Sequence, residues 1–166
     1  MQLLQNTGVK TTYCAKILKT YGADAVNIIR NNPYRLATDI PGIGFYFADK
    51  VALTLGVSRD DTRRVRACII HVIEQFTNEG HVFIFENQLV AKCGDLFSLE
   101  ADITRCSMEK LSENGELVIE NAPDTSENRM VYLKEIHRAE TGISNRLKAL
   151  LSVPVTPPTI DAERIS

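Results

Sequence analysis

Two glycines separated by one residue give this chain a candidate anion-binding turn. Residues 40–44 (Ile-Pro-Gly-Ile-Gly) precede an apolar-periodic run from Phe45 to Leu55, and Gly56 follows that run. Glycines leave the backbone N–H groups of a turn uncovered, and the free N–H groups at a helix N-terminus favour negative charge. The pattern predicts a phosphate-binding turn at the head of a helix, although two glycines alone fit an ordinary interhelical turn equally well.

A second copy of the segment favours the phosphate-binding interpretation. Residues 8–22 (GVKTTYCAKILKTYG) overlay residues 42–56 (GIGFYFADKVALTLG) without a gap, at an offset of 34 residues. Tetratricopeptide arrays share this period, but two copies are too few for a solenoid and the Trp of that repeat is missing. We therefore expect a paired module of two glycine hairpins. The first hairpin is degenerate, because Lys10 stands at the position equivalent to Gly44.

Charge is distributed unevenly along the chain, whose net charge is −2. Residues 1–66 hold ten Lys and Arg against five Asp and Glu, whereas residues 67–166 hold nine against sixteen. Both glycine hairpins lie in the basic part, as binding to a phosphate backbone requires. A lightly basic solvated surface is the alternative.

The candidate DNA contacts are the hairpin residues and the cations or aromatics near them. Tyr46 could stack on a base, whereas core packing is the better explanation for Phe45 and Phe47. A cluster of three arginines at the start of the next helix (Arg63, Arg64 and Arg66) suggests an external anion, with salt bridges to Asp60 and Asp61 as an equal alternative. The complete set is Gly8, Val9, Lys10, Lys16, Lys19, Gly42, Ile43, Gly44, Tyr46, Lys50, Arg63 and Arg64.

Several other protein classes are excluded by the composition. No apolar run approaches the 18 residues of a membrane span, and the first residues lack the apolar region of a signal peptide. The four cysteines are scattered without a C-x-x-C pattern, and the three histidines share no metal-ligand spacing with them. We expect a cytoplasmic protein with reduced thiols, no metal and no membrane contact.

The hydrophobic pattern predicts a mainly α fold with a small β-hairpin. Residues 1–57 read as helix and turn, and a helix capped by Asp61 or Thr62 runs to about Glu79. A β-prone run at 81–84, a helix at 86–96, a Ser98-capped helix at 99–113 and strands at 116–120 and 130–133 follow. This order is typical of a winged helix, so we assign residues 58–133 to a winged-helix-like α+β domain. The acidic residues of its third helix favour packing or protein contact over base reading.

The remainder is a helix at 134–151 and a proline-containing linker at 152–166. With these segments placed, the chain resembles the N-terminal region of RecD/TraA-type ATP-dependent DNA helicases over about residues 1–151. The resemblance is carried by Gly8-Val9, Asn32-Pro33-Tyr34-Arg35-Leu36, the segment Asp39 to Phe45, Ala48-Asp49, Gly80-His81-Val82, Arg138-Ala139-Glu140 and Arg146-Leu147.

The resemblance implies a tandem helix-hairpin-helix module that precedes a RecA-like motor moving 5′ to 3′ on DNA with ATP and Mg²⁺. It also implies a role in recombination or repair, with single-stranded or forked DNA as the expected partner. No G-x-x-x-x-G-K-[ST] segment occurs here. We therefore expect a fragment without a cofactor or enzymatic activity, whose C-terminal linker leads towards the missing motor domains.

Two other functions are compatible with parts of the sequence. A helix-hairpin-helix DNA glycosylase would have a similar layout, with Asp61 downstream of the hairpin. Glycosylases with lyase chemistry carry Lys two residues after the second glycine, however, and here that residue is Tyr46. A protein-interaction scaffold of the same helicase is the second alternative, since the acidic half could bind a partner protein.

Overall fold

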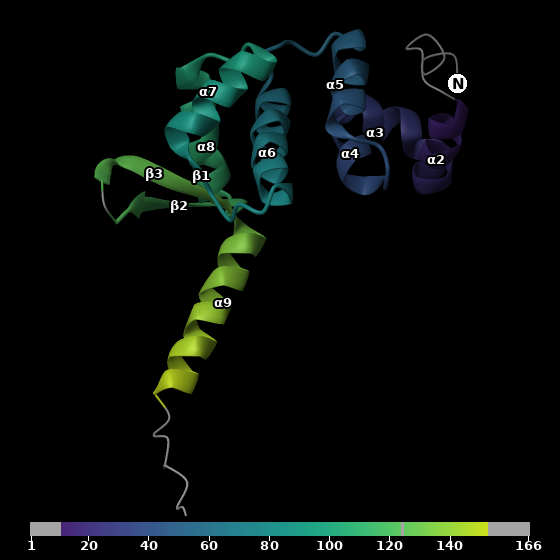
Figure 1. The fold of residues 1–166 in the computed structure, drawn as a ribbon. Coiled ribbons are helices and arrows are strands. Elements are labelled where there is room, and N and C mark those ends of the chain that lie inside the picture. The colour runs from purple at the N-terminus through teal and green to yellow at the C-terminus, as the bar shows by residue number, and fades with distance from the viewer. Residues whose placement is uncertain (1–10, 124, 153–166) are drawn as a thin grey trace, which may run out of the picture.

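The computed structural model describes residues 11–123 and 125–152, and the protein is mainly helical with a small sheet (Figure 1). The described helices are α2 (Thr11–Tyr21), the 3-10 turn Gly22–Asp24, α3 (Ala25–Asn31), α4 (Arg35–Asp39), α5 (Phe45–Thr54), α6 (Thr62–Asn78), α7 (Glu86–Phe97), α8 (Ala101–Glu113) and α9 (Lys134–Leu151). The strands are β1 (Ile84–Phe85), β2 (Leu117–Ala122) and β3 (Thr125–Leu133). This composition confirms the predicted fold class.

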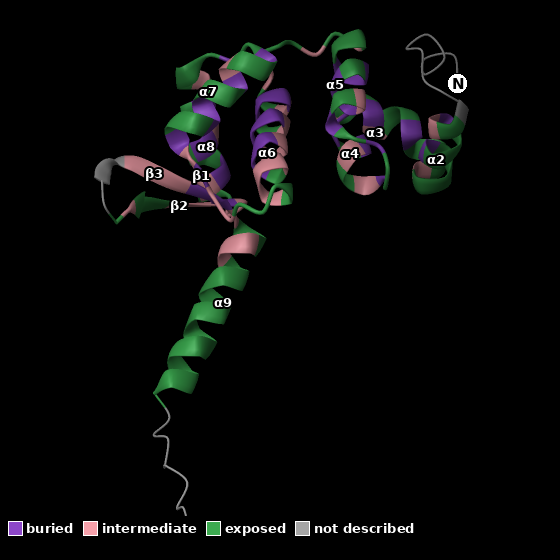
Figure 2. Ribbon diagram, in the orientation of Figure 1, coloured by how far each residue is buried: buried purple, intermediate pink, exposed green. Residues whose placement is uncertain are grey.

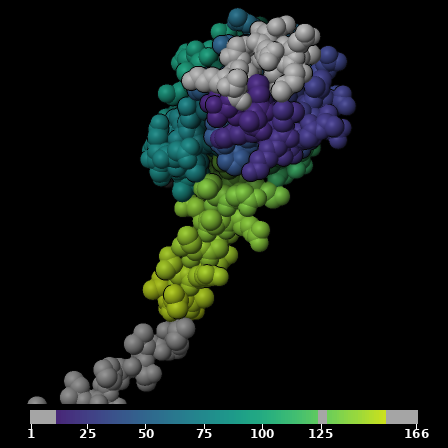
Figure 3. Space-filling model, turned by 90° about the vertical axis from the view of Figure 1, so that its right-hand side faces the viewer, coloured from purple at the N-terminus to yellow at the C-terminus, as the bar shows by residue number. Residues whose placement is uncertain are grey.

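Helices α2 to α5 carry the two sequence copies, and the copies end alike. Gly22 and Gly56 both have positive φ, +57° and +83°, as glycines that close a helix commonly do. Tyr13 of α2 and Phe47 of α5 hold equivalent positions and contact each other, with ring centroids 4.7 Å apart. The two copies therefore fold as one paired unit. Figure 3 views the molecule from the side on which α2 lies. Gly8, Val9 and Lys10 lie outside the described residues.

Elements α6 to β3 follow the predicted order of helix, strand, helix, helix and β-hairpin. The sheet is antiparallel with strand order β1-β3-β2, and it lies at one end of the α6–α8 group (Figure 1). Helix α6 is amphipathic and packs against α5, α7, α8 and β3. It therefore connects the repeat unit to the sheet-bearing unit.

Three local predictions need correction. Ser98 does not cap α8: it adopts a left-handed conformation (φ 55°) at the end of α7, and α8 begins after Glu100. The first strand occupies Ile84–Phe85 instead of 81–84, because only these residues pair with β3. The hairpin strands are longer than predicted, since cross-strand pairing extends the hairpin beyond its apolar residues.

Buried side chains from α2 to β3 form one continuous hydrophobic cluster. Figure 2 shows buried stretches on α5, α6, α7 and α8. Fully buried members come from both units, including Ile17 in α2, Leu36 in α4, Ile69 in α6 and Val131 in β3. Apolar burial of this kind is the main stabilising contribution to a small domain.

Helix α9 has the predicted bounds but extends away from the rest of the protein (Figure 1). None of its residues is buried, and its apolar side chains Ile143, Leu147, Leu150 and Leu151 are 54–85% exposed. Its first turns contact β2 and β3, where the His137 ring and the Glu120 carboxylate are 2.9 Å apart. Neither α9 nor any other described helix combines the length and hydropathy needed to cross a membrane.

We predict that core and α9 substitutions differ sharply in cost. Ile69→Ala should lower the free energy of unfolding by about 2–5 kcal/mol, because it leaves a cavity in a fully buried site. Leu147→Ala should change it by less than about 0.5 kcal/mol, since that side chain is 54% exposed. Urea denaturation followed by circular dichroism measures both. Equal losses would show that α9 packs against the body in solution.

Candidate nucleic-acid interface

Residues 40–43 form a tight turn whose two isoleucines anchor it. The Ile43 N–H donates to the Ile40 carbonyl oxygen at 3.1 Å, and Gly42 has a φ of +82°. Proline at the second position and a positive-φ glycine at the third are typical of a type II β-turn. Ile40 and Ile43 are 2% and 3% exposed, so their side chains fix the turn to the core.

Gly44 begins α5 and leaves the head of the helix open. It has φ −91° and ψ 170°, and its carbonyl accepts from the N–H groups of Phe47 (3.2 Å) and Ala48 (3.3 Å). Among the described residues, no carbonyl or side chain accepts from the N–H groups of Gly44, Phe45 and Tyr46. A Cβ built on Gly44 would have no atom of residues 11–123 or 125–152 within 4 Å. These N–H groups are therefore candidate donors for an external anion.

Lys16 of the first copy lies at the hairpin of the second. Its Nζ donates to the Pro41 carbonyl oxygen at 2.9 Å and lies 3.1 Å from the position of a Cβ on Gly42. An ammonium group has three donors, so two remain for an external acceptor. The two repeats thus contribute to one site, which the sequence overlay alone did not predict.

The other predicted cations near the hairpin are exposed. Lys19 lies one helical turn after Lys16 on α2, and Lys50 lies on the second turn of α5. Within the described part of the chain, neither ammonium group has an ion-pair partner within 4.0 Å. Tyr46, in the first turn of α5, is 58% exposed. The repeat unit thus exposes two lysines on α2 and α5 and one aromatic ring in the first turn of α5.

A buried polar network holds the hairpin helix against α6. The Asp49 carboxylate accepts from the Tyr34 hydroxyl at 2.7 Å and from Arg64 Nε and Nη2 at 2.9 and 3.1 Å. Arg64 also donates to the Arg59 carbonyl oxygen at 3.1 Å and is only 4% exposed. Burial and the hydrogen bond to Asp49 raise the pKa of Tyr34, so its hydroxyl stays protonated and donates. The network joins α4, α5 and α6.

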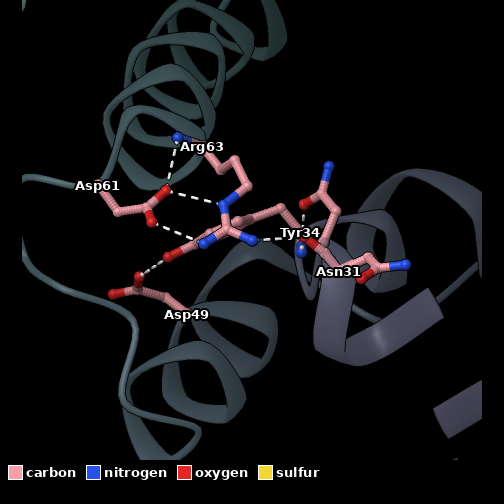
Figure 4. Close-up of polar contacts among 6 residues, drawn as sticks. Asn31, Tyr34, Asp49, Asp61 and Arg63 are labelled. Atoms are coloured by element: carbon pink, nitrogen blue, oxygen red, sulfur yellow. Dashed lines mark hydrogen bonds and ion pairs between the residues drawn. The ribbon is translucent and has the colours of Figure 1, made fainter. Parts of the chain in front are cut away.

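Arg63 forms a second bridge between the units, at the surface (Figure 4). Its guanidinium donates to both Asp61 oxygens, at 2.9 and 2.6 Å, and to the Asn31 carbonyl oxygen at the end of α3. Asp61 also caps α6 by accepting from the Arg63 N–H at 2.9 Å. These hydrogen bonds from Arg63 lower the pKa of Asp61, so the carboxylate remains charged.

Some of the residues predicted to contact DNA have their polar groups engaged within the protein instead. The amide of Ile43 is used by the turn, and the guanidinium groups of Arg63 and Arg64 are used by Asp61, Asp49 and backbone carbonyls. The salt-bridge alternative thus describes Arg63, although Arg64 pairs with Asp49 and not with Asp60. Gly42, Gly44, Tyr46 and Lys16 lie at the hairpin and the head of α5, and Lys19 and Lys50 are exposed on α2 and α5.

A known protein family matches the first half of this chain. A family model described as "ATP-dependent RecD2 DNA helicase HHH domain" matches residues 1–83. The chain belongs to this RecD2 family. It is also 28% identical, over 159 residues, to a protein from Deinococcus radiodurans named ATP-dependent RecD2 DNA helicase. The match covers 91% of this chain and 22% of that relative, so the chain spans about a fifth of the relative's length.

The structure gives roles to residues that the sequence reasoning left without one. Tyr34 and Asp49 were noted only as parts of the resemblance, yet they form the polar centre of the interface between the HHH unit and α6. Two sequence features could have pointed to these residues: a Tyr in the Asn-Pro-Tyr turn and an Asp on the apolar side of α5. The Asn32 side chain accepts from the Tyr34 N–H at 3.1 Å and orients this turn.

We predict that the Asp49 network is a major source of stability. Asp49→Ala should reduce the free energy of unfolding by about 3–5 kcal/mol, because it leaves the buried Arg64 guanidinium without its counter-charge. Asp102→Ala is the control, since Asp102 is fully exposed and lies 3.8 Å from Arg105. Its cost should be small by comparison, because exposed ion pairs contribute little to stability. Guanidinium chloride titration measures both, and similar costs would contradict the assigned role.

Stability should also fall on mild acidification because of His71. Burial lowers the pKa of His71, whose Nε2 is buried without a described partner. The folded pKa is below the unfolded value of about 6.5, so this contribution is complete above that pH and is lost as pH falls through the folded pKa. His71→Phe should therefore reduce the loss in melting temperature between pH 7.5 and 5.5.

His71 and Glu74 both line a hollow of about 220 Å³ between α4, α5 and α6. Burial raises the pKa of Glu74, so acidification affects this group in the opposite direction. Comparing His71→Phe with the unchanged protein cancels the Glu74 contribution. Identical pH profiles of the two proteins would contradict the assignment to His71.

Proposed function

We propose that this chain is the non-catalytic, DNA-binding N-terminal part of a RecD2-type ATP-dependent DNA helicase. Its helix-hairpin-helix unit would bind backbone phosphates without reading sequence. The observation that carries the proposal is the open N-terminus of α5 at Gly44, beside a turn that Lys16 contacts through Pro41. A phosphate at this position would accept from backbone N–H groups and from the lysine together.

Each contact of this kind is weak by itself. Neutralising one phosphate contributes a slope of about −0.7 to −0.9 in log K against log salt. With roughly two to four contacts, binding by the isolated chain would be micromolar or weaker. In a longer protein the unit would add avidity, because it keeps DNA near the other DNA-binding parts. Such contacts position DNA and carry no sequence preference.

The proposal extends to the longer protein. Its motor domains, outside this chain, would bind ATP and Mg²⁺ and move 5′ to 3′. The expected partner is single-stranded or forked DNA, the expected location is the cytoplasm, and the expected process is recombination or repair. We also propose that α6 to β3 is a winged-helix variant. Its acidic α8 would serve as scaffold, since Glu109 pairs with Arg129 of β3 at 2.6 Å.

A second candidate function rests on α9. Its exposed apolar side chains, beside an acidic unit, would suit a partner protein. A glycosylase has less support. Tyr46 occupies the position of the lyase lysine, and the Asp61 carboxylate is engaged by Arg63 at the start of α6.

We predict that DNA affinity depends on the head of α5. Gly44→Val fits the backbone and the open space, and it should block phosphate approach. Lys50→Ala should weaken binding about fivefold and make the salt slope shallower by about one. Lys148→Ala, an equal charge change on α9, is the control. Fluorescence anisotropy at several salt concentrations measures all three.

If Gly44→Val and Lys50→Ala bind DNA like the unchanged protein, the hairpin is not the DNA-binding site. A partner protein captured equally by all variants would then favour the interaction-scaffold function.

A further inference from the structure

Tyr46 is an exposed aromatic side chain at the head of α5. It follows Gly44 by two residues and is 58% exposed, whereas its neighbour Phe45 is 7% exposed. Phe47 is half-buried against Tyr13. Of these three consecutive aromatics, two have packing roles and the third faces solvent beside the open N–H groups. Burial would usually be more favourable for a large aromatic ring.

The Tyr46 ring is supported by other rings from three helices. Its centroid lies 5.6 Å from that of Phe45 and 5.1 Å from that of His71, both nearly perpendicular. Phe97 of α7 lies 6.4 Å away. Phe45 and His71 are themselves stacked, with centroids 4.5 Å apart and planes 12° apart. The cluster restrains the ring and leaves more than half of the residue accessible, so little side-chain freedom would be lost on stacking.

We propose that Tyr46 stacks on an unpaired nucleobase of the DNA strand whose phosphate lies at the Gly44 turn. This inference rests on the proposed phosphate site. Every base has an aromatic face, so stacking is tolerant of sequence. Bases inside a duplex have both faces covered by their neighbours. The platform therefore selects single-stranded DNA or the unpaired arm of a fork, which backbone contacts alone would not distinguish from duplex.

The sequence offers a direct reporter, because it contains no tryptophan. Tyr46→Trp would place the sole indole at the platform and keep an aromatic face there. We expect oligothymidylate to quench its fluorescence, because a stacked base lies against the indole. An abasic oligonucleotide of the same length and a blunt duplex should leave the fluorescence unchanged, because the first has phosphates without bases and the second has no unpaired base.

Affinity measurements separate stacking from phosphate binding. The unchanged chain should bind oligothymidylate about tenfold more tightly than the abasic oligonucleotide. Tyr46→Ala should abolish this difference and leave abasic binding unchanged, whereas Tyr46→Phe should retain it. Ile143→Ala is the matched control, since Ile143 is 60% exposed but lies on α9. Gly44→Val should weaken both ligands.

Three results would overturn the stacking proposal. The first is that the unchanged chain binds oligothymidylate and the abasic oligonucleotide with equal affinity, and that Tyr46→Ala binds them equally too. The second is that the indole fluorescence of Tyr46→Trp is not quenched when oligothymidylate is bound. The third is equal quenching by blunt duplex. In each case a loss of binding in Gly44→Val would still support the phosphate site. If neither oligonucleotide nor duplex binds the unchanged chain, the proposed function fails together with this inference.

Discussion

The carboxylate of Asp49 is the interaction on which the arrangement of the two units depends. It lies on α5, and it is bound by a hydroxyl from the turn before α4 and by a guanidinium from α6. A charged group at 8% exposure is tolerated only with a counter-charge and satisfied hydrogen bonds. Because Arg64 meets it with two nitrogens, the pair fixes the orientation of α5 relative to α6 as well as its distance.

This constraint has consequences for the candidate site. The hairpin and the first turn of α5 are held in three ways. The Asp49 carboxylate binds Tyr34 and Arg64. The side chains of Ile40 and Ile43 are buried at the two ends of the turn, and the Phe45 ring packs against His71 and Phe97. A phosphate or base that met the head of α5 would therefore meet preformed donors and a fixed ring. Preorganised sites lose less entropy on binding than flexible ones.

The sheet-bearing unit has its own buried polar centre. The Glu86 carboxylate at the start of α7 accepts from Arg129 of β3 at 2.6 Å and from Arg105 of α8 at 3.2 Å. These contacts lower the pKa of Glu86, with the hydrogen bond from Arg129 as the largest cause. These ion pairs lie within the sheet-bearing unit, and its exposed extension is α9. DNA contact and protein contact would occupy opposite ends of the chain.

Sequence alone determined what is local: most of the helices, the repeat, the element order and a cap at Asp61 or Thr62, of which the structure shows Asp61. These follow from hydrophobic periodicity and from backbone preferences that act within a few residues. Tertiary structure decided which side chains are available. Arg63 and Arg64 look like exposed cations at a helix start. The Asp61 partner of Arg63 is local and was one of the two sequence alternatives, but Asp49 and the carbonyl of Asn31 are brought to these arginines only by folding. Lys16 joins the second hairpin for the same reason, because contacts between residues distant in the chain arise only when helices pack.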